Sequence, residues 1–151
     1  MTTELKALDV AQSILYIAHQ AGDNITNLKL QKLLYYAQAW YLVNFDKPLF
    51  EDNIEAWQYG PVVREVYIAF NKYQNKPISK FDKKAIDKLT AEQVDYLKEF
   101  CAYFMKFSAS ELVSMTHSEQ PWIEAYEQGA QTVISIETMK TYYNGLRNAT
   151  I

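Results

Sequence analysis

The feature that most restricts the fold of this chain is a helical segment, residues 26–42, which carries apolar or aromatic side chains on nearly every face. Leu30, Leu33 and Leu34 begin an apolar stripe at helical spacing, and Thr26 can cap the first turn. A helix without a continuous polar face has to lie centrally in a fold or at an interface. We therefore expect the core to be built around this segment.

Apolar residues at helical spacing, capping residues, and the glycine and proline residues that separate these segments predict further helices on both sides. They are expected to begin near Leu8, Pro61, Thr90, Ser108, Pro121 and Ser135. A short β-hairpin or two extended pieces are predicted for residues 49–58, with turn chemistry at Asp52-Asn53, and Val133-Ile134 is expected to be extended. The fold class is therefore mainly α, with about six or seven helices and a minor β-hairpin, or α+β if the hairpin forms.

The length of 151 residues is typical of one domain, so residues 1–151 are expected to form a single compact unit. The single cysteine, Cys101, excludes an intramolecular disulfide and a multi-cysteine zinc site. No apolar run approaches the roughly 18 residues of a membrane span. Met1 to Lys6, with Glu4 beside Lys6, lacks the apolar region of a signal peptide. A cytoplasmic protein is therefore predicted.

The charge balance argues against nucleic acid as the partner, because the net charge is −3 and the pI is about 5.4. Residues 71–89 are the exception, since six lysines and two aspartates give this segment a local charge of +4. It is expected to be an exposed loop with at most a short helix near its end. Lysines without arginine lack the bidentate groups that read base edges, so a solvated loop is the preferred interpretation.

Residues that could carry catalysis are few. The chain has no phosphate-binding glycine-rich loop, no nucleophile elbow and no helix with paired metal-binding histidines. Cys101 and His117 could form a dyad, but Cys101 lies on an apolar helical stripe, where a buried structural thiol is the preferred interpretation. His117 and Glu119 supply only two potential metal ligands. We therefore expect no catalytic residue, no metal and no cofactor.

Four segments of the chain, taken in order, resemble the Panacea-domain family, which is also called SocA-like and phage-associated. They are residues 25–38 (ITNLKLQKLLYYAQ), 48–63, 111–122 and the tail from Ile134-Ser135. The second segment contains EAWQYGPVV, and the third contains EL, TH and PW. The resemblance extends from about residue 8 to residue 145, so we expect the whole chain to be one Panacea domain.

The resemblance implies a binding module rather than an enzyme. Members of this family are antitoxins of type II toxin–antitoxin systems, which neutralise a cognate toxin protein by direct protein–protein binding. One branch acts as an adaptor that delivers its toxin to an ATP-dependent Clp-type protease. The implied partners of this chain are therefore a toxin protein and, in the adaptor form, such a protease.

The contacting surface is predicted from the aromatic and polar residues of these motifs, because tyrosine and tryptophan dominate binding hot spots. The second helix is expected to present Gln31, Lys32, Tyr35 and Gln38. The other predicted contacts are Trp57, Tyr59, His117, Glu119 and Trp122. Trp57 and Trp122 are expected to be partly buried with paired indole N–H groups. His117 is expected to bond the last carbonyl groups of a helix, or to grip a partner.

Other interpretations stay open at this point. Residues 71–89 allow a nucleic-acid-binding regulator, for example an autorepressor of its own operon. The family resemblance also allows a phage-encoded protein that interacts with the host. An enzyme would have to use His117 and Glu119 as acid–base groups.

Overall fold

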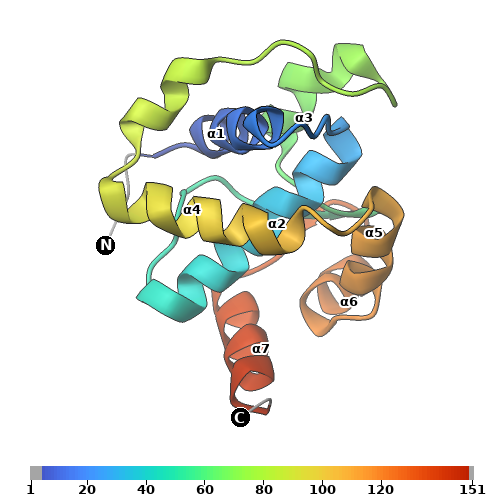
Figure 1. The fold of residues 1–151 in the computed structure, drawn as a ribbon. Coiled ribbons are helices and arrows are strands. Elements are labelled where there is room, and N and C mark those ends of the chain that lie inside the picture. The colour runs from blue at the N-terminus through green and yellow to red at the C-terminus, as the bar shows by residue number, and fades with distance from the viewer. Residues whose placement is uncertain (1–4, 150–151) are drawn as a thin grey trace.

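The computed structural model describes residues 5–149 (Figure 1). Residues 1–4, which are most of the segment used above to judge whether a signal peptide is present, lie outside the described residues. The α-helices are α1 (Ala7–Gln20), α2 (Asn27–Phe45), α3 (Arg64–Phe70), α4 (Ala91–Phe104), α5 (Ala109–His117), α6 (Gln120–Glu127) and α7 (Ile136–Ala149). Two short 3-10 helices, η1 (Asn71–Tyr73) and η2 (Lys83–Lys88), lie between α3 and α4. The prediction of a mainly α fold with a minor β element is confirmed.

Helix α2 is the centre of the fold, as its sequence predicted. It packs against α1, α3, α4, α5, α7 and strand β2 (Gly60–Val62), and most of its side chains are buried. The Thr26 hydroxyl accepts the Lys29 N–H at 3.2 Å, which confirms the expected cap. Figure 1 shows α4 crossing in front of α2, with α5 and α6 on the right and α7 extending below. Because α2 is enclosed on several sides, its polar side chains have to find partners inside the protein.

The β element is a three-stranded antiparallel sheet with the order β2-β1-β3, where β1 is Glu55–Trp57 and β3 is Thr132–Val133. A hairpin forms, but it spans residues 55–62 instead of the predicted residues 49–58, and its turn is Gln58-Tyr59 rather than Asp52-Asn53. The predicted helix start at Pro61 is wrong, because Pro61 pairs with Ala56 in β2 and α3 begins at Arg64. Gly60 has a φ of 114°, which a helical start does not allow, and Pro61 is tolerated because β2 is an edge strand.

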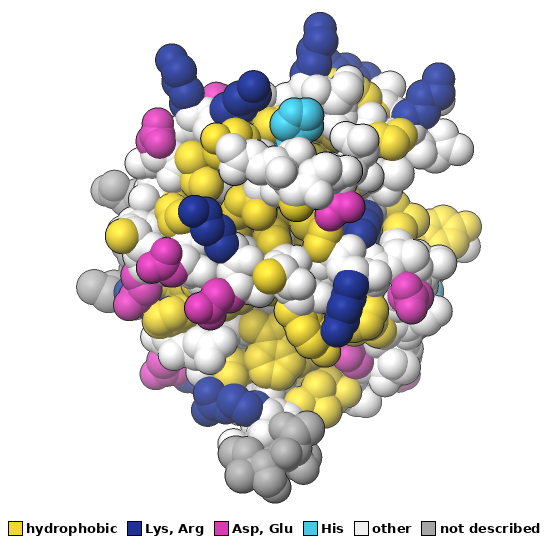
Figure 2. All heavy atoms as spheres, viewed as in Figure 1, with side chains coloured by type: hydrophobic (Ala, Val, Ile, Leu, Met, Phe, Trp, Pro, Cys, Tyr) yellow, Lys and Arg dark blue, Asp and Glu magenta, His cyan; other side chains and the backbone are white. Residues whose placement is uncertain are grey.

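Residues 71–89 are an ordered strap over α1 rather than a simple exposed loop. Ile78 and Ala85 are buried, and the Ile78 N–H donates to the Ile25 carbonyl at 2.9 Å. Lys88 forms an ion pair with Asp9 of α1 at 3.1 Å. Figure 2 shows lysine and arginine side chains projecting from the upper rim, where this strap runs in Figure 1. The apolar residues of the segment therefore anchor it while most of its lysines remain exposed.

Within residues 5–149, no cluster of three or more His, Cys, Asp or Glu side chains could hold a metal ion. No helix in the same part of the chain is both long enough and apolar enough to cross a membrane. Cys101 is buried in α4, and burial raises the pKa of its thiol to about 12. A thiol with so high a pKa is a poor nucleophile, which agrees with the structural role predicted for Cys101.

Candidate partner-binding site

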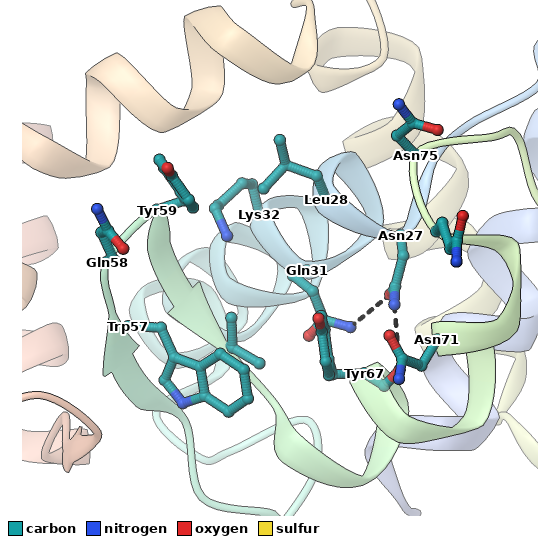
Figure 3. A pocket seen from close by; sticks show the side chains of 12 residues that line it. Asn27, Leu28, Gln31, Lys32, Trp57, Gln58, Tyr59, Tyr67, Asn71 and Asn75 are labelled. Atoms are coloured by element: carbon teal, nitrogen blue, oxygen red, sulfur yellow. Dashed lines mark hydrogen bonds between the residues drawn. The ribbon is translucent and has the colours of Figure 1, made fainter.

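A row of buried amides along the first turns of α2 forms the floor of a groove (Figure 3). Gln31 Nε2 donates to Asn27 Oδ1 at 2.9 Å, and Asn27 Nδ2 donates to the Tyr67 carbonyl at 3.1 Å. Gln31 Oε1 accepts the Val63 N–H at 2.9 Å. These bonds satisfy the main-chain N–H of Val63, just before α3, and a carbonyl in the last turns of α3. The floor is therefore fixed before any partner arrives.

Lys32 lies at the same level of α2, and its side chain is fully buried. Its Nζ donates to the Pro61 carbonyl at 2.9 Å. No aspartate or glutamate of residues 5–149 forms an ion pair with it. Burial lowers the pKa of Lys32 from 10.5 to about 7, because the charged amine loses its hydration. The groove floor therefore contains an amine that is close to its titration point at neutral pH.

The β-hairpin and α3 supply an aromatic wall around Trp57. The Trp57 indole N–H donates to Glu55 Oε1 at 2.9 Å, and Arg64 forms an ion pair with the same oxygen at 2.8 Å. The Arg64 guanidinium lies 5.3 Å from the centre of the Trp57 ring. The Tyr67 ring packs beside Trp57 with 5.0 Å between the ring centres. These contacts restrict the rotamers of the wall, so that it presents a defined surface.

The groove between α2, the hairpin and the start of the strap has a volume of about 460 Å³. Leu28 and Tyr59 stand at its rim with 40% and 61% of their surfaces exposed. Its remaining lining residues are Asn27, Gln31, Lys32, Trp57, Gln58, Val62, Tyr67, Asn71, Gln74 and Asn75. The groove therefore has two exposed large side chains at its rim, the buried amides of Asn27 and Gln31 on its floor, and exposed amides around its edge.

A second polar cluster is centred on Glu119, which immediately precedes α6. The hydroxyls of Tyr36 and Tyr143 both donate to Glu119 Oε1 at 2.6 Å. The Tyr35 hydroxyl lies 3.0 Å from that of Tyr143. Burial raises the pKa of Glu119, and the two phenol hydrogen bonds partly oppose this rise. The cluster joins α2, α6 and α7 through one carboxylate.

His117 and Trp122 stack on each other at the corner between α5 and α6, with 4.1 Å between their ring centres. The Trp122 indole N–H donates to the Trp57 carbonyl at 2.9 Å, so the predicted pairing of both indoles is confirmed. His117 is the last residue of α5, and its buried Nε2 has no hydrogen-bond partner among residues 5–149. The hydrogen bond predicted between the His117 ring and the last helical carbonyls is therefore not made by this nitrogen. Stacking on Trp122 positions the ring instead.

The predicted contact face of α2 is corrected by the structure, since Gln31, Lys32, Tyr35 and Gln38 are all buried. Gln38 Oε1 accepts the N–H groups of Leu49 and Phe50 at 2.7 and 3.2 Å, and its Nε2 donates to the Phe50 carbonyl at 2.8 Å. Three of the four polar side chains bond the main chain of the connection between α2 and α3, which includes β2, and Tyr35 bonds Tyr143. None of the four forms an exposed contact face, although Gln31 and Lys32 still line the floor of the groove.

The nine predicted site residues therefore separate into groups, and Gln38 stands apart from them because it bonds the main chain of Leu49 and Phe50. Gln31, Lys32, Trp57 and Tyr59 line one groove. Tyr35 and Glu119 belong to the tyrosine cluster, while His117 and Trp122 form the stacked corner. Sequence reasoning missed Leu28, although it lies inside the first motif, and also the amides of Asn71, Gln74 and Asn75. Those three occupy the lysine-rich segment, where only the tertiary fold brings them to the groove.

The fold and site define a mainly α domain that encloses a central helix and carries a groove with fixed walls. The sequence profile of the family described as "Antitoxin SocA-like, Panacea domain" matches residues 30–123, and the chain belongs to this family. The Antitoxin SocA of Caulobacter vibrioides (strain NA1000 / CB15N) is 35% identical over a 124-residue alignment, and the match covers 75% of this chain and 66% of that protein. No solved structure matches the chain.

Proposed function

We propose that this protein is the antitoxin of a type II toxin–antitoxin system and that it neutralises its toxin by binding rather than by catalysis. Family membership and the similarity to Antitoxin SocA support this role. The observation that carries the proposal is the groove, in which exposed Leu28 and Tyr59 stand above a hydrogen-bonded floor. A segment of the toxin binds there, with apolar side chains against the rim.

The groove is suited to this task because its floor and one wall need no rearrangement on binding. The amides of Asn27 and Gln31 already bond the protein's own main chain, and Trp57 is held by Glu55 and Arg64. Rigid contact residues reduce the entropy lost on association. A tyrosine at the rim contributes a large contact area with few rotatable bonds. Tyr59 is therefore the expected hot spot of the interface.

The experiment is co-expression of this protein with the product of the adjacent open reading frame. The neighbour is expected to be toxic alone, tolerated in the presence of this protein, and co-purified with it. Tyr59→Ala is then compared with Ile68→Ala, because Ile68 has a similar exposed fraction, 64%, but does not line the groove. We expect Tyr59→Ala to weaken toxin binding by about 2 kcal/mol, the usual size of a hot-spot loss.

A neighbour that is harmless alone and never co-purifies would contradict the antitoxin role. Equal binding losses in the Tyr59→Ala and Ile68→Ala variants would contradict the groove as the contact surface while leaving the antitoxin role intact. Circular dichroism melting of both variants controls for folding. Both side chains are largely exposed, so little change in stability is expected from either substitution.

Neutralisation can proceed by masking the toxin or by delivering it to an ATP-dependent Clp-type protease. We propose that binding in the groove is the first step of either route, because both require the same direct contact. The lifetime of the toxin distinguishes them. Masking leaves the toxin stable in the complex, whereas delivery shortens its lifetime only in cells that contain the protease.

A further inference from the structure

A second cavity, of about 340 Å³, opens on the opposite half of α2 from the groove floor. Its walls are mostly aromatic, with Tyr36 and Trp40 from α2 and Tyr103 and Phe104 from α4, and Glu119 lies among them. The Tyr36 and Phe104 rings stack with 5.2 Å between their centres. Figure 2 shows apolar side chains reaching the surface between α4 and α7. The cavity is thus an aromatic box that contains one carboxylate.

The carboxylate of Glu119 is only half satisfied by the protein. Tyr36 and Tyr143 both donate to Oε1, whereas Oε2 has no hydrogen-bond partner among residues 5–149. Each phenol hydroxyl has one proton and gives it to Oε1. This oxygen therefore accepts two hydrogen bonds, which an oxygen of an ionised carboxylate can do. The free oxygen therefore offers an acceptor on a residue that lines the cavity.

No cation of the described chain neutralises this carboxylate. The ion pairs of residues 5–149 join Arg64 to Glu55, Lys88 to Asp9 and Lys140 to Asp46. A partly buried charge without a counter-ion is unfavourable, and a cationic ligand would relieve that cost. Aromatic faces attract the same kind of ligand through their quadrupoles. Beside the cavity, Lys106 Nζ already lies 4.0 Å from the centre of the Tyr103 ring, which shows that this ring accepts a cation.

We propose that this cavity receives an arginine side chain of the partner protein, with its guanidinium against the aromatic walls and one N–H donating to Glu119 Oε2. The proposal deepens the proposed function and rests on it in one respect, namely that the partner is a protein. Arginine fits better than lysine because its planar, weakly hydrated guanidinium stacks on aromatic rings. The exposed part of Tyr103, 54% of its surface, leaves the entrance accessible.

The first test uses N-acetylarginine amide as the probe and the indole N–H signals of the uniformly ¹⁵N-labelled protein as the readout. Trp40 lines the cavity, whereas Trp57 lies in the groove and serves as the internal reference. We expect the Trp40 signal to shift with saturation and the Trp57 signal to stay in place. The neutral isostere N-acetylcitrulline amide should cause no shift, and N-acetyllysine amide should bind more weakly than the arginine probe.

Glu119→Gln removes the charge but keeps a carbonyl oxygen that can accept both phenol hydroxyls. We expect it to weaken the arginine probe about tenfold, the size of a charge-assisted contact in a partly desolvated site. Glu127→Gln, at an exposed position of α6, the helix that Glu119 precedes, is the matched control for loss of one charge. Tyr103→Leu provides a second variant that leaves the Glu119 hydrogen bonds in place and should also weaken the probe.

Three results would overturn the proposal: an unmoved Trp40 signal, an equal effect of the citrulline probe, or unchanged binding in the Glu119→Gln variant. Lysine binding as tightly as arginine would overturn the choice of arginine. The probe needs no toxin, so its outcome is independent of the antitoxin assay. If the probe binds but the neighbouring protein is not neutralised, the proposed function fails and the site stands. If neutralisation survives in Glu119→Gln and no probe binds, the site fails and the function stands.

Discussion

Gly60 approaches Lys32 so closely that a Cβ atom on Gly60 would lie 2.6 Å from Lys32 Cε and 2.9 Å from Thr116 Oγ1. The backbone of Gly60 also has a φ of 114°, which side-chain-bearing residues rarely adopt. The hairpin can therefore lie against α2 and α5 only with a glycine at this position. This contact closes the groove floor from the side of the sheet.

The first prediction is that Gly60→Ala destabilises the protein by about 3 kcal/mol, the sum of backbone strain and overpacking. Gly22→Ala is the matched control, because Gly22 also has a positive φ, 82°, but nothing lies within 4 Å of its Cβ position. It should lose only the strain contribution, about 1 kcal/mol. Urea denaturation measures both. Equal losses would show that the contact with Lys32 adds nothing.

The second prediction concerns pH and Lys32, whose pKa falls from 10.5 in the unfolded chain to about 7 in the folded protein. Between these values the unfolded state binds more protons, so the free energy of unfolding rises with pH. The stability cost is complete below about pH 7 and disappears towards pH 10.5. The slope approaches about 1.4 kcal/mol per pH unit within this window.

Lys32→Met removes this titration and keeps an unbranched side chain. We expect the difference in stability between the wild type and the variant to change with pH from 7 to 9, with the wild type gaining relative to the variant. The Pro61 carbonyl loses its donor in the variant, which adds a cost of about 1–3 kcal/mol that does not depend on pH. Denaturation at several pH values checks the slope. Parallel profiles would mean that Lys32 keeps an ordinary pKa.

The third prediction is that Gln38→Leu costs about 3 kcal/mol or more, although the side chains have similar sizes. Gln38 makes three hydrogen bonds to the main chain of Leu49 and Phe50, and each buried group left unpaired costs about 1–3 kcal/mol. Gln128→Leu is a suitable control, since Gln128 is exposed just after α6. Thermal melts compare the two variants. A small loss in both would indicate that the 49–50 segment is satisfied by water.

The sequence predicted the elements well because their signals are local. Thr26 and Ser108 cap α2 and α5, as the sequence predicted. The apolar side chains on nearly every face of α2 correctly indicated that this helix lies centrally in the fold. The wrong start of α3 has a tertiary cause. Gly60-Pro61 resembles the start of a helix, but Gly60 is required by its contact with Lys32 and Thr116, which lies in α5. No local pattern contains that information.

The candidate site was predicted less well, for a related reason. Polar residues at helical spacing usually indicate a solvent-facing surface, whereas Gln31, Lys32 and Gln38 bond main-chain groups of the connection between α2 and α3. Whether a polar residue meets water or an irregular backbone depends on neighbours distant in sequence. Of the two large side chains exposed at the groove, Tyr59 was predicted as a contact residue and Leu28 was not.

The last prediction separates the structural role of His117 from a role in catalysis or partner contact. His117→Phe keeps a ring to stack on Trp122 and removes the buried Nε2 that has no hydrogen-bond partner among residues 5–149. We expect stability to be unchanged or higher, since burying an unpaired polar atom is unfavourable. His117→Ala should lose about 1 kcal/mol with the stacking contact. Both variants should still neutralise the neighbouring toxin once folded, as measured by co-expression growth and thermal melts. Loss of neutralisation in a stable His117→Phe variant would instead assign the imidazole to the partner interface, or to chemistry shared with Glu119.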